Sequence, residues 1–176
     1  MRTLMADGGH VVDVRPAADY AAGHIPGSLS IPLRDQFATW LGWLLPETAP
    51  LAFVTGEDHD LNEIVAQAHK IGYERLAGCL AGGMTAWLAD GNPQTTTAFL
   101  TADRADGRPY VDVRQEAEFA AGHVPGAVHI ELSGAGPGRV GQRFGDGGVG
   151  LDQGVVRRAH ESASRYETTH EAVTPK

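Results

Sequence analysis

One short unit occurs twice in this chain. Residues 12–33 read VDVRPAADYAAGHIPGSLSIPL, and residues 111–132 read VDVRQEAEFAAGHVPGAVHIEL. The separation between the copies exceeds the period of solenoid repeats and fits a duplicated small domain. The residues that follow each copy differ greatly, so the two copies predict different structures.

The first copy predicts the start of an α/β domain. The β-branched run Val11–Val14 is typical of a buried parallel strand, and Pro16 suits the first turn of a short helix that stops at Gly23. A turn and a second strand follow, and apolar residues at helical spacing then predict a helix that ends before Pro46. Strands alternating with helices in this order favour a parallel sheet.

The third strand leads into the candidate site. Residues 51–54 are apolar, and the next helix carries its apolar face on Leu61, Ile64, Val65 and Ala68. Asp60 and Glu63 suit a capping pair at its start. The loop between strand and helix is where open α/β sheets place ligands and where the helix dipole favours anions. Its residues are Thr55, Gly56, Glu57, Asp58, His59 and Asp60.

Three motifs give the chain a family resemblance. DVR, GHIPGS and, after the last strand, GGMTAW occur in order in the first copy, and DVR with GHVPGA recurs in the second. The chain resembles rhodanese-like (sulfurtransferase) domains, from about Val11 to Gly91 and again from about Tyr110 to Leu132. The resemblance implies an α/β fold with a small parallel sheet and helices on both faces, followed by a truncated second copy. It also implies that only the segment Arg2–Gly9 stands where the family usually has a further strand and helix.

The resemblance also identifies what the loop lacks. Family members use a loop cysteine whose thiolate accepts a sulfane sulfur, yet Thr55 stands at that position and Asp60 where an arginine is common. A threonine hydroxyl is not appreciably ionised near neutral pH and forms no persulfide. The carboxylates of Glu57, Asp58 and Asp60 would repel an anionic donor. The first copy is therefore predicted to be catalytically silent, with no catalytic residue.

The repeated signature residues are predicted to be structural. Asp13 with Arg15 should brace the end of a strand through hydrogen bonds and charge, and the two histidines of the repeated turns should serve the turn rather than bind a ligand. The signature residues are Asp13, Arg15, His24 and Gly27 in the first copy, and Asp112, Arg114, His123 and Gly126 in the second.

The other reactive or aromatic residues are predicted to have structural roles, and each has an alternative that stays open. Cys79, the only cysteine, is expected to be a small buried core residue, the alternative being a sulfur acceptor. The Glu57–Asp60 run is expected to be a solvated loop with a helix cap rather than a metal site. Trp40, Trp43 and Trp87 are expected to pack in the core or between helices rather than form a stacking platform.

The second copy is predicted to be incomplete. Thr95–Ala102 can supply an edge strand and the start of a helix, and the repeated unit follows, but periodicity stops after Leu132. The glycine-rich and polar stretch beyond it is predicted to be disordered, and one hypothesis is an out-of-frame or truncated gene product. The predicted domains are 1–91, a partial second domain 92–133 and a tail 134–176, with no second catalytic site.

Composition and resemblance together limit the function. A net charge of −8 argues against nucleic acid and anionic membranes, and a single cysteine with no long apolar run predicts a cytoplasmic protein. The run GYERLAGCLAGGMTAW resembles the rhodanese region of metallo-β-lactamase-fold hydrolases, although their HxHxDH motif is missing here. Three hypotheses remain: a silent binding or scaffolding module or fragment, a thiosulfate or persulfide sulfurtransferase, and an interaction partner of such a hydrolase. No cofactor or metal is predicted, and the oligomeric state is not defined.

Overall fold

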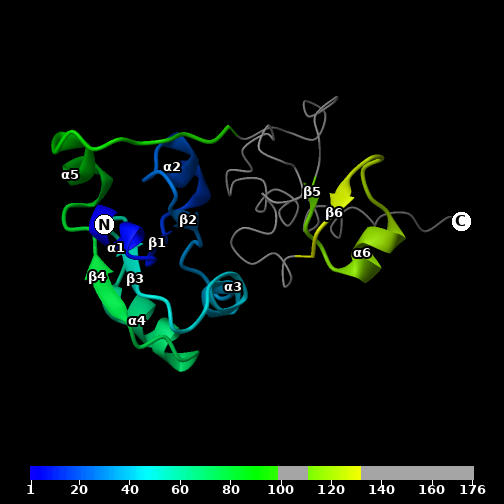
Figure 1. Cartoon of the computed structure of the whole chain (residues 1–176), viewed down its shortest axis with the longest axis horizontal. Coiled ribbons are helices and arrows are strands. Elements are labelled where there is room, and N and C mark those ends of the chain that lie inside the picture. The colour runs from blue at the N-terminus through cyan, green and yellow to red at the C-terminus, as the bar shows by residue number, and fades with distance from the viewer. Residues whose placement is uncertain (99–110, 132–176) are drawn as a thin grey trace, which may run out of the picture. The chain divides into compact units, whose positions relative to one another are not determined.

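The computed structural model describes residues 1–98 and 111–131 of the 176-residue chain. Contacts divide the chain into two compact units, Met1–Phe99 and Leu100–Lys176, which are considered one at a time below. The described residues contain only α/β structure (Figure 1). The glycine-rich and polar tail, with its predicted disorder, lies outside the described residues.

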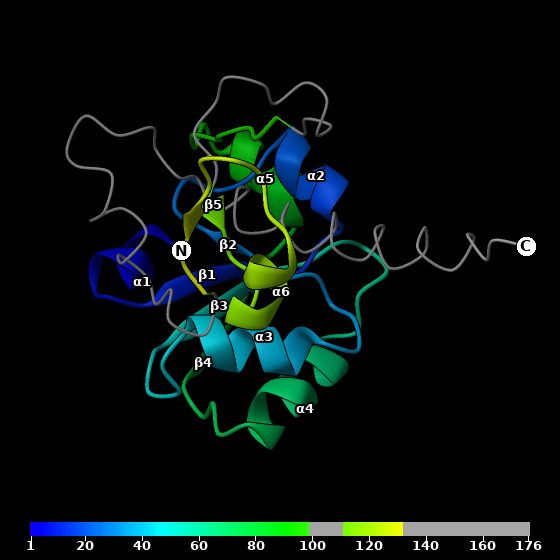
Figure 2. The ribbon, with the colours of Figure 1, turned by 90° about the vertical axis from the view of Figure 1, so that its right-hand side faces the viewer.

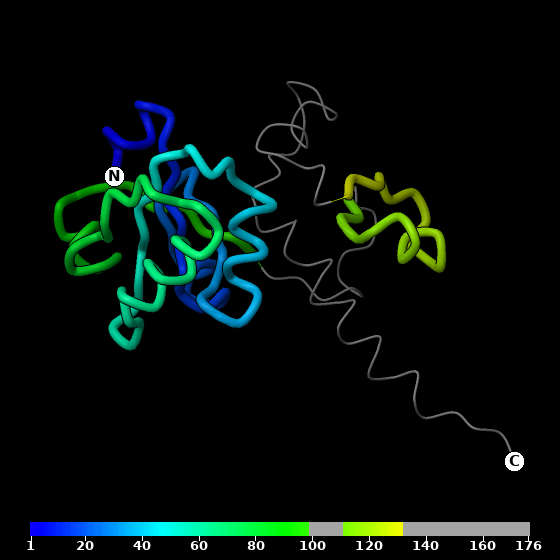
Figure 3. Tube along the Cα trace, turned by 90° about the horizontal axis from the view of Figure 1, so that it is seen from below, coloured from blue at the N-terminus to red at the C-terminus, as the bar shows by residue number. Residues whose placement is uncertain are grey.

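The first unit alternates helices with strands, and its Cα trace runs unbroken from Met1 to Ala98 (Figure 3). Its strands form one parallel sheet in the order β2-β1-β3-β4. The elements are α1 (Arg2–Ala6), β1 (His10–Asp13), α2 (Ala17–Ala22), β2 (Leu29–Ser30), α3 (Phe37–Leu44), β3 (Leu51–Val54), α4 (Leu61–Lys70), β4 (Leu76–Cys79) and α5 (Gly83–Ala89).

Apolar residues are buried on both faces of this sheet, as a β-branched central strand requires. On one face Val12 and Phe53 join a core cluster with residues of α3 and α4. On the other face Val11 and Val54 pack with Trp87 of α5, and residues of α1 pack against that second cluster. Figure 2 shows α3 and α4 on one side of the strands and α5 on the other. The predicted parallel sheet with helices on both faces is confirmed.

Some burial predictions were wrong. Trp43 was expected to pack in the core or between helices, yet it is 47% exposed, and it meets Trp40 only in a tilted ring contact. Leu61 was expected on the inner face of α4 but is 42% exposed, because it is the first residue of the helix. The buried residues of α4 are Ile64 and Ala68. Single outward apolar side chains are common on folded proteins.

Two local predictions also need correction. Glu63 does not complete a capping box with Asp60, since its carboxylate accepts from Gln67 one turn further along the helix. The predicted edge strand at Thr95 reduces, within the described residues, to a single antiparallel bridge with His24, and the rest of that segment lies outside them. The helix α1 was not predicted, because Arg2–Ala6 is too short to show helical periodicity.

The second unit is described over residues 111–131. It comprises β5 (Val111–Asp112), α6 (Glu116–Ala121) and β6 (Val128–His129), with the two strands parallel. This order repeats that of β1, α2 and β2, with the register Asp112–His129 matching Asp13–Ser30. The repeated sequence therefore forms the same local structure twice.

Candidate functional site

The loop of residues 55–60 lies at the carboxyl edge of the sheet. It follows β3, whose last residue Val54 is paired with Asp13 at the end of β1, and it leads into the first turn of α4. A methyl group added at Gly56 would lie 3.1 Å from Nδ1 of His59 and 4.0 Å from Cγ of Arg15. The fold thus brings the loop and the Asp13–Arg15 motif together, as open parallel sheets generally do with the ends of adjacent strands.

Backbone N–H groups of this loop hydrogen-bond to the loop's own side chains. The N–H of Gly56 donates to Nδ1 of His59 at 3.0 Å. The carboxylate of Asp60, the N-cap of α4, accepts from the N–H of Asn62 at 2.8 Å. Two of the donors that an anion would use at a helix N-terminus are therefore engaged within the protein.

The charge at the loop is negative. Glu57, Asp58 and Asp60 are all exposed, while Thr55 and His59 are half-buried. The Arg15 side chain reaches Gly56, but its Nη2 donates to Asp13 Oδ2 at 2.6 Å and to the carbonyl of Gly23 at 2.8 Å. Because this guanidinium is neutralised by a fully buried carboxylate, it adds little positive potential to the loop.

The DVR motif makes the same hydrogen bonds in both units. Arg114 repeats the arrangement of Arg15, with Nη2 2.7 Å from Asp112 Oδ2 and 2.7 Å from the carbonyl of Gly122. Burial alone would raise the pKa of the Asp112 carboxyl, but hydrogen bonds from the Arg114 side chain and backbone, with its charge, outweigh burial and hold that pKa below its usual value. The motif ties a strand end to the glycine that stops the next helix.

The repeated histidines make the same contacts in the two turns. His24 stacks on Tyr20 with ring centroids 3.8 Å apart, and its Nδ1 lies 2.8 Å from the Tyr20 carbonyl. His123 stacks on Phe119 at 3.7 Å in the same way. Gly27 and Gly126 have φ of 80° and 82°, a conformation that favours glycine, so each turn needs its glycine.

Cys79 lies outside the loop. It is the last residue of β4, its Cα is paired with that of Phe53, and its side chain packs against the cluster under α3 and α4. Cys79 was expected to be a small buried residue, but it is only partly buried, because β4 is an edge strand of the described sheet. Its partners are apolar, which fits a packing role.

Neither a metal site nor a membrane span occurs among the described residues. Residues 1–98 and 111–131 hold no group of three or more His, Cys, Asp or Glu side chains arranged to bind a metal ion. Among the helices of those residues, none has the length and apolar composition needed to cross a lipid bilayer.

Comparison with protein families decides the relationship. The model of the rhodanese-like domain matches residues 1–90 and again residues 96–148, which together make up most of the chain. The chain belongs to the rhodanese-like domain family. The two matches contain the two copies of the repeated unit, so the family relationship extends to both halves of the sequence.

Solved structures of rhodanese-like proteins show similarity to this chain. A rhodanese-like domain from Anabaena sp. is 23% identical with a TM-score of 0.48, covering 53% of this chain and 98% of that one. A single-domain sulfurtransferase from Saccharomyces cerevisiae is 24% identical with a TM-score of 0.42, covering 49% and 82%. A thiosulfate sulfurtransferase from Pseudomonas aeruginosa is 17% identical with a TM-score of 0.45, covering 69% and 28%. No curated protein sequence matched.

Sequence reasoning located the rhodanese-like loop but missed its internal hydrogen bonds. The bond from Gly56 to His59 spans three residues, and neither residue type signals it in advance. The hydrogen bonds that hold residues 93–97 against α2 were missed as well, because Thr-rich sequence predicts extended backbone without showing what it pairs with.

Proposed function

We propose that this protein is a rhodanese-like module that binds or scaffolds and does not transfer sulfur through its loop. The observation that carries the proposal is the composition and bonding of residues 55–60. Thr55 opens the loop, Gly56 donates to His59, and three exposed carboxylates surround the start of α4. The loop of a sulfurtransferase needs a thiolate, and it needs positive charge or free amides to bind its anionic donor. Residues 55–60 contain no thiol, and their carboxylates oppose the binding of an anion.

The thiol at Cys79 supports this proposal by its position. A sulfur acceptor must be reached by the sulfur donor and by the final acceptor in turn. Cys79 is in a strand, packed against the core cluster beneath α3 and α4. A cysteine in this environment is suited to packing.

The test is cyanide-dependent thiocyanate formation from thiosulfate by the purified full chain. The matched control is Cys79→Ala, which removes the only thiol and leaves the loop unchanged. We expect wild type and Cys79→Ala to give the same background rate. A wild-type rate well above background that is lost in Cys79→Ala would instead establish the alternative, a thiosulfate or persulfide sulfurtransferase that uses Cys79.

The resemblance of residues 72–87 to hydrolase-associated rhodanese regions motivates a partner hypothesis within the same proposal. A binding module of this kind would recognise a metallo-β-lactamase-fold hydrolase as a separate chain. We expect the tagged full chain to retain such a hydrolase in a pull-down from its own cells. Repeated pull-downs that retain no such hydrolase would contradict the partner hypothesis. The proposal of a binding or scaffolding module would then stand without a hydrolase partner.

A further inference from the structure

An extended segment covers the repeated turn in the first unit. Residues 93–98, here called the strap, follow α5 and run past α2 (Figure 1). His24 and Thr95 exchange two backbone hydrogen bonds of 2.9 Å each, and the N–H of Thr97 donates to the carbonyl of Ala21 at 2.9 Å. The strap is anchored at its start, where Nε1 of Trp87 donates to the carbonyl of Pro93 at 2.7 Å.

Burial of the first turn accompanies this cover. His24, whose backbone pairs with the strap, is only 1% exposed. Ile25 is buried in a different way, because it packs in the core cluster with Val11, Val54 and Trp87. The Gln94 side chain closes over Gly23, where an added methyl group would collide with its Oε1. The strap therefore contributes both backbone pairing and side-chain cover to the turn.

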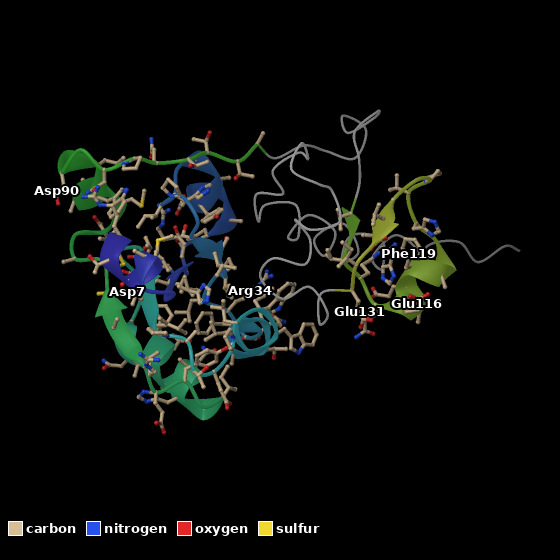
Figure 4. The ribbon with its side chains drawn as sticks, in the orientation of Figure 1. Asp7, Arg34, Asp90, Glu116, Phe119 and Glu131 are labelled. Carbon is tan, nitrogen blue, oxygen red and sulfur yellow. The ribbon has the colours of Figure 1, made fainter. Side chains whose placement is uncertain are left out.

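The second unit contains the same turn without that cover. Residues 120–126, here called the second turn, are all exposed, and Val124, the equivalent of Ile25, is 46% exposed. Within residues 111–131 the N–H and C=O of His123 make no backbone hydrogen bond. The turn is nevertheless built as in the first unit, with the imidazole of His123 stacked at 11° on Phe119, which projects from α6 (Figure 4).

We propose that the second turn is a docking site for an extended, uncharged polypeptide segment. The segment pairs antiparallel with His123 through two backbone hydrogen bonds, donates a third to the carbonyl of Ala120, and lays a side chain over Gly122, as Gln94 does over Gly23. This is addition of a strand segment to exposed backbone groups, a recurring mode of peptide recognition. The strap shows the geometry, because the two turns share sequence and conformation.

The composition of the strap indicates the chemistry of the partner. Residues 92–98 read NPQTTTA, with no charged side chain and three β-branched threonines that favour extended backbone. The residue paired with His123 must carry an N–H, so proline is excluded at that position. Glu116 and Glu118 occupy the first turn of α6, which disfavours an acidic segment.

The experiment titrates the ¹⁵N-labelled full chain with an end-blocked peptide of residues 92–98. We expect saturable amide shifts at Ala120–Val124 with weak affinity, because a short free peptide must offset the entropy lost on association with only a few contacts. The equivalent amides of the first turn should not shift, because their own strap remains attached. A peptide with Thr95→Pro should give no saturable shift, because it lacks the N–H that pairs with His123.

Three results would overturn the proposal. The first is a titration with no saturable shift at Ala120–Val124. The second is an equal response to the Thr95→Pro peptide, which would mean that backbone pairing is not involved. The third is hydrogen exchange of the His123 amide that is already as slow as that of His24 in the free chain, which would mean that the second turn is covered without a partner.

Discussion

At the scale of single residues, Arg15 is the side chain on which the first unit depends most directly. It neutralises a fully buried carboxylate and holds the glycine that ends α2. We expect Arg15→Met to lower the free energy of unfolding by about 3 kcal/mol, because a buried charge left without its partner is strongly destabilising. Urea denaturation measures the loss. Arg75→Met, which removes an exposed guanidinium bonded to a carbonyl, is the control and should cost about 0.5 kcal/mol or less.

Equal losses in the two variants would contradict the bracing role of Arg15. That role was predictable from sequence, because an aspartate and an arginine two residues apart recur after the same strand in both copies. The additional bond from Arg15 to Gly23 was not, since it depends on where the short helix ends.

A second residue-scale prediction concerns the missing thiol. Thr55→Cys alone is expected to leave thiocyanate formation at background, because the new thiol would face carboxylates rather than a cation. Combining it with Asp60→Arg replaces a negative group with a positive one. That change should lower the pKa of the thiol, because a positive group favours the thiolate, and so raise the rate of thiocyanate formation above background.

Thr55→Ser with Asp60→Arg is the matched control for that pair, since it keeps the charge change without a thiol. A rate for Thr55→Cys alone equal to that of the double variant would contradict the electrostatic part of the account.

At the scale of elements, the cap of α4 can be separated from the charge of the loop. Asp60→Ala should cost about 1 kcal/mol of stability, because the N–H of Asn62 loses its acceptor. Asp58→Ala removes the same charge without removing a cap, and its effect on the unfolding free energy should be close to zero. If chemical denaturation gives the same loss for both, the cap contributes nothing of its own.

The free energy of unfolding should depend on pH through the buried side chain of Tyr73. Its hydroxyl donates to the carbonyls of Leu41 and Leu45 near the end of α3, and burial, with the charge of Glu47, raises the pKa of Tyr73 above its usual value. A raised pKa in the folded state means that its contribution is complete below pH 10 and is lost as pH rises through the folded value.

Stability of the wild type should therefore fall more steeply above pH 10 than that of Tyr73→Phe. At neutral pH the same variant should be less stable by about 1–2 kcal/mol, because two hydrogen bonds are lost. Denaturation of both proteins across this range tests the point, and parallel pH curves would refute it.

Sequence patterns predicted the positions of helices and strands better than they predicted which side chains are buried. The β-branched run at Val11–Val14 and the proline and glycine stops predicted the alternation of strands and helices from β1 onward, because these residues act locally, but they gave no sign of α1. Trp43 and Leu61 were misplaced because burial depends on how a helix is rotated against the sheet, and a short helix shows too few turns to define that rotation. The strap was missed because its partner lies far away in the sequence.

At the scale of the whole molecule, the first unit should fold alone. Both of its core clusters consist of residues between Met1 and Trp87, and the strap returns the chain to α2 before Ala98. A chain ending at Ala98 should unfold cooperatively. Its midpoint temperature should equal that of the transition in which the first unit unfolds in the full chain. Thermal denaturation followed by circular dichroism checks this, and loss of the cooperative transition would show that residues beyond Ala98 are needed.

We propose that the loop of residues 55–60 does not bind the anionic donors of sulfur transfer, because its side chains accept from the amides of Gly56 and Asn62 and carry negative charge. The most direct measurement is a titration of the ¹⁵N-labelled full chain with thiosulfate, at constant ionic strength, following the amides of Gly56 and Asn62. The account predicts only small, unsaturable shifts at both amides. Saturable shifts confined to this loop, absent with chloride at the same ionic strength, would contradict it.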